Sequence, residues 1–80
     1  MKFRITIERK PGLADPEGKA TIRSLHDLGY TDVQHVSFGR AIVLDIDSTD
    51  ETAALDEVDA MCQQLLANPV MESYRIERIG

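Results

Sequence analysis

The first residues of the chain alternate between apolar and polar side chains. Phe3, Ile5 and Ile7 are each separated by one polar residue. A period of two is typical of a strand with one buried and one polar face, and Pro11 and Gly12 are residues that end strands. The pattern therefore predicts a strand from the start of the chain to the turn at these two residues.

A helix is predicted over residues 16–28, where the apolar residues recur every third position. Asp15 is a strong N-cap, Pro16 suits the first helical position, and Gly29 is the expected residue of positive φ after the last turn. The side chains expected to face inward are Ile22, Leu25 and Leu28. This segment is predicted to pack one apolar face against a sheet.

Gly18 lies in the first turn of this helix, where glycine is up to about 1 kcal/mol less favourable than alanine. Two explanations stay open. Another part of the backbone approaches Gly18 too closely for a side chain, or the weakness is simply tolerated.

The next segment predicts a β-hairpin over residues 33–47, with Gly39-Arg40 as a two-residue type II′ turn. In this register one face carries Val33, His35, Ser37, Ile42, Leu44 and Ile46. The other face carries the apolar residues Val36, Phe38, Ala41 and Val43. Because an antiparallel sheet with helices on one side has only one apolar face, the second cluster indicates burial by another chain. The alternative is a bulge that turns Val36 and Phe38 inward.

A second helix and a last strand complete the chain. Ser48 or Asp50 is the expected cap, and the apolar stripe comprises Leu55, Val58, Met61, Cys62 and Leu65. Asn68 is expected to end the helix in the left-handed conformation, and Pro69 cannot continue it. Residues 70–79 then alternate as in a strand.

The order of the predicted elements is strand, helix, strand, strand, helix, strand. With right-handed crossovers, this order predicts an α+β fold of the ferredoxin-like βαββαβ type, in which two helices lie on one face of a four-stranded antiparallel sheet. The 80 residues make one domain, residues 1–80, and a core of this size supplies little stability, so small domains of this kind often associate.

Composition narrows the possible partners. The chain has 14 acidic and 9 basic residues, a net charge of −5 and four aromatic residues, which disfavours a nucleic-acid partner. Cys62 is the only cysteine, so an intrachain disulfide is excluded. Without a signal sequence or a long apolar stretch, the chain is expected in the cytoplasm and not in a membrane.

Candidate chemistry is sparse. Phosphate-binding, dinucleotide-binding and metalloprotease motifs are lacking. His26 and His35 have no second ligand nearby in sequence, and the carboxylates at the start of the second helix fit a solvated face. We expect no catalytic residue, no bound cofactor and no metal, which indicates a binding or assembly module.

Three stretches carry a family resemblance. They are Leu13–Ala20 (LADPEGKA), Leu28-Gly29-Tyr30 followed by Val33 and Val36, and Met61-Cys62 with Leu65–Tyr74 (LLANPVMESY). Over essentially its whole length the chain resembles the PurS family, the small subunits of bacterial and archaeal phosphoribosylformylglycinamidine (FGAM) synthase. It departs from the family at Arg40, where Gly-Lys is usual, and within the last motif at Met71 and Ser73.

The resemblance implies a dimer or higher oligomer that assembles with a large synthetase subunit and a glutaminase subunit. The complex converts formylglycinamide ribonucleotide, ATP and glutamine to FGAM in purine synthesis, and the large subunit uses the ATP and Mg²⁺. The small subunit would join the two active subunits without catalytic residues of its own. The candidate self-association residues are Val36, Phe38, Ala41 and Val43. The candidates for contact with the larger subunits are Arg40 and the helix start at Asp15, Pro16 and Gly18.

Two other functions are open. An ACT-like regulatory domain shares the strand and helix order, and Pro11-Gly12-Leu13 follows the first strand as a ligand loop would. A small enzyme that works between subunits is the third possibility.

Overall fold

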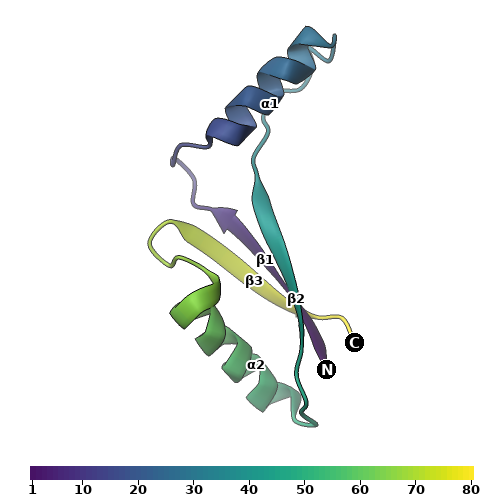
Figure 1. Cartoon of the computed structure of the whole chain (residues 1–80), viewed down its shortest axis with the longest axis vertical. Coiled ribbons are helices and arrows are strands. Elements are labelled where there is room, and N and C mark those ends of the chain that lie inside the picture. The colour runs from purple at the N-terminus through teal and green to yellow at the C-terminus, as the bar shows by residue number, and fades with distance from the viewer.

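The computed structural model describes all of residues 1–80 as an elongated α+β molecule (Figure 1). The elements are β1 (Lys2–Arg9), α1 (Pro16–Asp27), β2 (Gly39–Asp45), α2 (Glu51–Met61), the π-helical turn η1 (Cys62–Leu66) and β3 (Glu72–Arg78). The three strands form one antiparallel sheet in the order β2-β1-β3. None of the helical segments has the length and apolarity needed to cross a bilayer.

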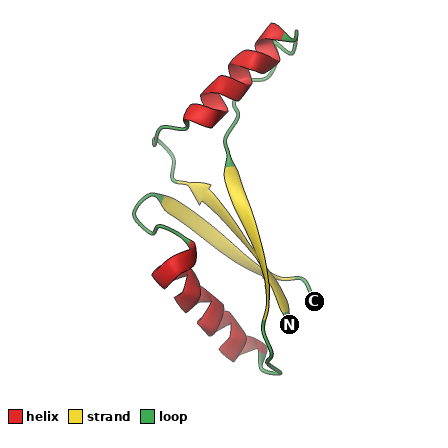
Figure 2. Ribbon diagram, viewed as in Figure 1, coloured by secondary structure: helices red, strands yellow, loops and turns green.

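The core lies between one face of this sheet and α2 (Figure 2). The fully buried side chains are Phe3, Ile5 and Ile7 from β1, and Ala54, Val58 and Cys62 from α2 and η1. The alternation predicted for the first strand is therefore confirmed. Only eight of the 80 residues are buried, so the core is thin for the length of the chain.

The prediction of a four-stranded sheet is wrong, because the predicted hairpin over residues 33–47 does not form. Gly39-Arg40 is the start of β2 and not a turn, and β2 pairs with β1 so that Ile5 lies opposite Ile42. Residues 33–38 are in no strand, so neither the type II′ turn nor the alternative bulge exists. The physical reason is the set of contacts that hold residues 33–38 to α1: the N–H of Phe38 donates to the Asp15 carboxylate, and the carbonyl of Val36 lies directly beside Gly18.

The prediction that both helices lie on one face of the sheet is also wrong. Figure 1 shows α2 beneath the sheet, whereas α1 projects beyond the end of the strands and lies along residues 28–38. We name α1 together with residues 28–38 the arm. No arm residue belongs to the core cluster, and α1 has no extensive packing against the strands or α2.

The local signals of the first helix act as predicted. The Asp15 side chain accepts a hydrogen bond from the backbone N–H of Gly18 (3.0 Å), and Pro16 is the first helical residue. Gly29 has a φ of +101°, which suits a residue without a Cβ after the last turn. The α-helix ends at Asp27, one residue before the predicted end.

The second helix ends differently from the prediction. Its cap is Asp50, whose side chain accepts from the N–H of Ala53 (3.2 Å). In the wide turn η1 the N–H of Ala67 bonds to the carbonyl of Cys62 (3.1 Å), five residues back. The wide turn moves the apolar stripe by one residue, so Leu66 is half-buried whereas Leu65 is 82% exposed.

Asn68 does not adopt the left-handed conformation expected of it, because all residues of positive φ are glycines. Its side chain instead accepts from the N–H of Val70 (3.1 Å), and its carbonyl accepts from the N–H of Glu72 (2.7 Å). This turn, which includes Pro69, leads into β3 at Glu72, two residues after the predicted start of the strand.

Candidate functional site

The predicted residues Asp15, Gly18, Val36 and Phe38 meet at the root of the arm, where it joins the sheet. One carboxylate oxygen of Asp15 caps α1 at Gly18, and the other accepts from the backbone N–H of Phe38 (2.8 Å). These two N–H groups stabilise the charged form, so the pKa of Asp15 lies below its ordinary value. A single side chain thus holds the helix start and the returning segment together.

Gly18 is buried because the backbone returns directly beside it. A Cβ at this position would lie 2.3 Å from the carbonyl oxygen of Val36 and 2.8 Å from the Asp15 carboxylate. Of the two explanations for Gly18, close backbone approach is therefore confirmed. The glycine fixes the distance between α1 and residues 28–38, which form the other, extended half of the arm.

The apolar side chains of the arm lack a core of their own. The half-buried apolar residues of the arm are Ile22, Leu25, Val33 and Val36, and of these Ile22 and Val36 border one hollow between its two halves. Leu28 is 74% exposed and Phe38 is 42% exposed. Several exposed apolar side chains on a structural unit without a core are typical of an interaction site.

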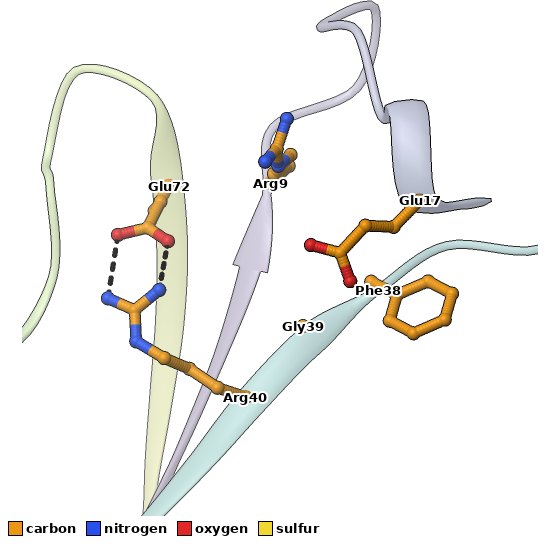
Figure 3. Close-up of a pocket in the computed structure, with 6 residues that line it drawn as sticks. All are labelled: Arg9, Glu17, Phe38, Gly39, Arg40 and Glu72. Carbon is orange, nitrogen blue, oxygen red and sulfur yellow. Dashed lines mark hydrogen bonds and ion pairs between the residues drawn. The ribbon is translucent and has the colours of Figure 1, made fainter. Parts of the chain in front are cut away.

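Arg40 is used within the chain. It lies on the helix-covered face of β2 and makes a two-point ion pair with Glu72 of β3, at 2.5 and 3.0 Å (Figure 3). It also donates to the carbonyl of Leu66 at the end of η1 (2.8 Å). The pKa of Glu72 is lowered by Arg40 and by the N–H of Asn68, and the same carboxylate raises the pKa of Arg40. Arg40 thus joins β2, β3 and η1.

The remaining predicted residues do not join the cluster at the arm root. Ala41 lies on the open face of the sheet, where it borders a groove of about 340 Å³ together with Phe38. Val43 lies further along the same face and is 55% exposed. Pro16 contributes to the helix start only. Val36, Phe38, Ala41 and Val43 therefore do not form the single patch expected of a hairpin.

Other charged residues near the arm root were not predicted from the sequence. Arg9 at the end of β1 donates to the carbonyl of Ala14, and Glu17 extends from the first turn of α1. Together with Glu72 they border a pocket of about 210 Å³. Only the strand register reveals this pocket, because it brings Glu72 opposite Arg9.

The chain shows little that could hold a metal or act as a nucleophile. No three His, Cys, Asp or Glu side chains lie close enough together to bind a metal ion. Cys62 is fully buried in the core, and burial together with the nearby Asp59 raises the pKa of its thiol. A buried thiol of raised pKa is a packing residue, as its position in the apolar stripe predicts.

The sequence and the fold both match known proteins. A family model described as PurS, phosphoribosylformylglycinamidine (FGAM) synthase, matches residues 2–80. The phosphoribosylformylglycinamidine synthase subunit PurS of Archaeoglobus fulgidus is 43% identical over 72 residues, which are 90% of each chain.

Two solved structures superpose on nearly the whole chain. The crystal structure of Methanocaldococcus jannaschii PurS, described as one of the subunits of formylglycinamide ribonucleotide amidotransferase in the purine biosynthetic pathway, has a TM-score of 0.84 and 34% identity and covers 99% of this chain and 98% of its own. A chain in the structure of PurLQS from Thermotoga maritima has a TM-score of 0.90 and 28% identity, with 98% and 95% covered. The chain belongs to the PurS family of FGAM synthase subunits.

Proposed function

We propose that this chain is an assembly subunit of FGAM synthase that joins the synthetase and glutaminase subunits and associates with copies of itself. In this role the large subunit uses ATP and Mg²⁺, the glutaminase supplies ammonia from glutamine, and this chain supplies surface. The proposed compartment is the cytoplasm. The observation that carries the proposal is the arm, a structural unit without a core, in a chain that belongs to the PurS family.

The dimensions of the chain support this role. The radius of gyration is 16.2 Å, whereas a compact domain of this length has a radius of gyration of about 12 Å. The chain extends over 50 × 26 × 14 Å. A chain that folds so far from a sphere exposes apolar surface that only another chain can cover.

The arm is the proposed self-association surface. Val36 and Phe38 would contribute to it together with Leu25 and Leu28, since all four have apolar surface that the single chain leaves open. Ala41 and Val43 would extend the contact along the open face of β2. Burial of one large apolar side chain contributes about 1.5–3 kcal/mol, so a few of them suffice for a stable contact.

The proposed contacts with the larger subunits are at the arm root. Arg40 keeps half of its side chain exposed although it pairs with Glu72. The helix start at Asp15, Pro16 and Gly18 fixes how the arm leaves the sheet, and so where those subunits would dock. An ACT-like sensor and a stand-alone enzyme are less well supported, because the family match spans residues 2–80.

Reconstitution tests the proposal. The purified chain is mixed with the large synthetase subunit and the glutaminase subunit, and FGAM formation is followed with glutamine as the nitrogen source. We expect no FGAM from this chain alone and glutamine-dependent FGAM only when all three are present. Equal rates with and without this chain would reject the proposal, as would FGAM formation by the chain alone.

A further inference from the structure

The side of α2 that faces away from the sheet is not covered by another element of the chain (Figure 1). Its exposed side chains include Glu57, Met61 and Leu65, which follow one another at intervals of four residues and so lie along one row of the helix surface. Asp56 precedes this row and is also exposed. We name these four residues the outer patch. It is acidic at one end and apolar at the other.

Leu65 is exposed because of the wide turn η1. In a regular α-helix, residue 65 would lie on the same face as Val58 and Cys62, which are both fully buried. The hydrogen bond from the N–H of Ala67 to the carbonyl of Cys62 widens the turn, and Leu66 takes the inward position instead. Leu65 is left 82% exposed. Single wide turns of this kind are rare and frequently lie at functional sites.

The net charge of the chain is concentrated around the outer patch. Residues 50–66 contain no lysine or arginine, and their five acidic residues are Asp50, Glu51, Asp56, Glu57 and Asp59. The other 9 acidic residues are balanced by the 9 basic ones, so this segment carries the entire net charge of −5. Three of the five acidic side chains are used within the chain, as the cap of α2 or in contacts with Arg78 and Tyr74. Asp56 and Glu57 take part in none of the ion pairs, so their charges are available to a partner.

We propose that the outer patch binds a larger subunit of FGAM synthase, at a basic surface with an apolar pocket that receives Leu65. This inference rests on the proposed assembly function and adds a second contact surface to the arm root. Burial of Leu65 and Met61 supplies the affinity, because the removal of apolar surface from water drives association. Lysine or arginine side chains around the pocket pair with Asp56 and Glu57 and fix the orientation of the partner.

A second copy of the chain does not fit the outer patch. In a symmetric contact the same residues of both copies meet, so the acidic side chains of two α2 helices would lie together. Like charges at close range disfavour such a contact. The rest of the chain is neutral and offers no net positive charge to α2. The partner of the outer patch is therefore a different protein, whereas the arm serves self-association.

Isothermal titration calorimetry tests the proposal, with the full-length chain titrated into the large synthetase subunit, into the glutaminase subunit and into a mixture of the two. We expect Leu65→Asp to weaken binding at least tenfold, whereas Leu65→Met keeps an apolar side chain and should bind like the unaltered chain. Glu57→Lys should also weaken binding at least tenfold. Its matched control is Glu77→Lys, which reverses a charge on the open face of the sheet and should have little effect. Added salt should weaken the binding of the unaltered chain more than that of Glu57→Lys.

Sedimentation of Leu65→Asp is the control for folding, because this variant should still associate with itself as the unaltered chain does. If Leu65→Asp or Glu57→Lys bound the larger subunits as tightly as the unaltered chain, the outer patch would be refuted as a docking surface. Glutamine-dependent FGAM formation in the three-subunit mixture would then still support the assembly function. If the unaltered chain bound neither subunit nor their mixture, both proposals would be contradicted.

Discussion

Replacing Gly18 by alanine separates two opposite expectations. Alanine is the better helix former by about 1 kcal/mol, so the sequence alone favours a more stable α1. In the structure, the added Cβ would lie 2.3 Å from the carbonyl oxygen of Val36, whereas ordinary contacts begin at 3.4 Å. The extended half of the arm would have to retreat by about 1 Å.

The steric cost of the added Cβ is larger than the gain in helix propensity. Overpacking of this kind costs about 1–3 kcal/mol, and the obstacle is backbone, which cannot move aside as a flexible side chain would. The same Cβ lies 2.8 Å from the Asp15 carboxylate, so the hydrogen bond that this carboxylate accepts from the Phe38 N–H is also disturbed. The net effect expected is a loss of about 1 kcal/mol, equivalent to a decrease in Tm of about 4–8 °C.

Thermal unfolding followed by far-UV circular dichroism, at one fixed protein concentration, measures this effect. Ser24→Ala is the matched control, because it also raises helix propensity in α1 but at an exposed position. We expect Ser24→Ala to leave Tm unchanged or slightly raised. If Gly18→Ala raised Tm as well, the close approach of Val36 to α1 would be refuted.

Three further predictions concern Arg40, the two carboxylates and Phe38. Arg40→Lys should lower stability by about 1 kcal/mol in denaturant titrations, because an ammonium cannot reproduce the two-point pair, whereas Arg75→Lys, on the open face without a partner, should not. The pKa values of Asp15 and Glu72 lie below their ordinary 3.8 and 4.5 in the folded chain, so both carboxylates stabilise it above those values and lose this effect as pH falls through the lowered values. Urea midpoints between pH 7 and pH 2 should therefore drop less in Asp15→Asn and Glu72→Gln than in the unaltered chain, and parallel profiles would contradict this. Phe38→Ala should weaken self-association several-fold, and an unchanged oligomer in sedimentation would remove Phe38 from the interface.

The sequence was sufficient to predict those elements that short-range interactions determine. The alternation of Phe3, Ile5 and Ile7 identifies β1, and the cap at Asp15 with Pro16 identifies the start of α1. These signals act over a few residues and do not depend on the rest of the fold. The family resemblance, which was drawn from the residues at the start of α1 and after α2, agrees with the family match.

The error about the hairpin has a different physical origin. Gly39-Arg40 between two apolar runs has the local composition of a two-residue turn. The deciding interactions are long-range: the N–H of Phe38 donates to the Asp15 carboxylate, and the carbonyl of Val36 packs beside Gly18. Local composition carries no information about either contact.

The candidate site was predicted only in part, because long-range contacts determine it as well. Asp15, Gly18, Val36 and Phe38 do meet, but through the backbone contact between Gly18 and Val36 and not across a hairpin. The role of Arg40 in joining β2 to β3 depends on the position of Glu72, which no local pattern reveals. Ala41 and Val43 are on the open face because the register of β2 is set by its neighbour β1.

The central claim is that another copy of the chain covers the arm, and sedimentation velocity over a range of concentrations tests it with two matched variants. Leu28→Asp places a charge on the arm, and Leu65→Asp places the same charge on a similarly exposed leucine outside it. We predict that the unaltered chain associates, that Leu28→Asp raises the dissociation constant at least tenfold, and that Leu65→Asp leaves it unchanged. A chain that stays monomeric at every concentration, or a Leu28→Asp variant that associates like the unaltered protein, would contradict the claim.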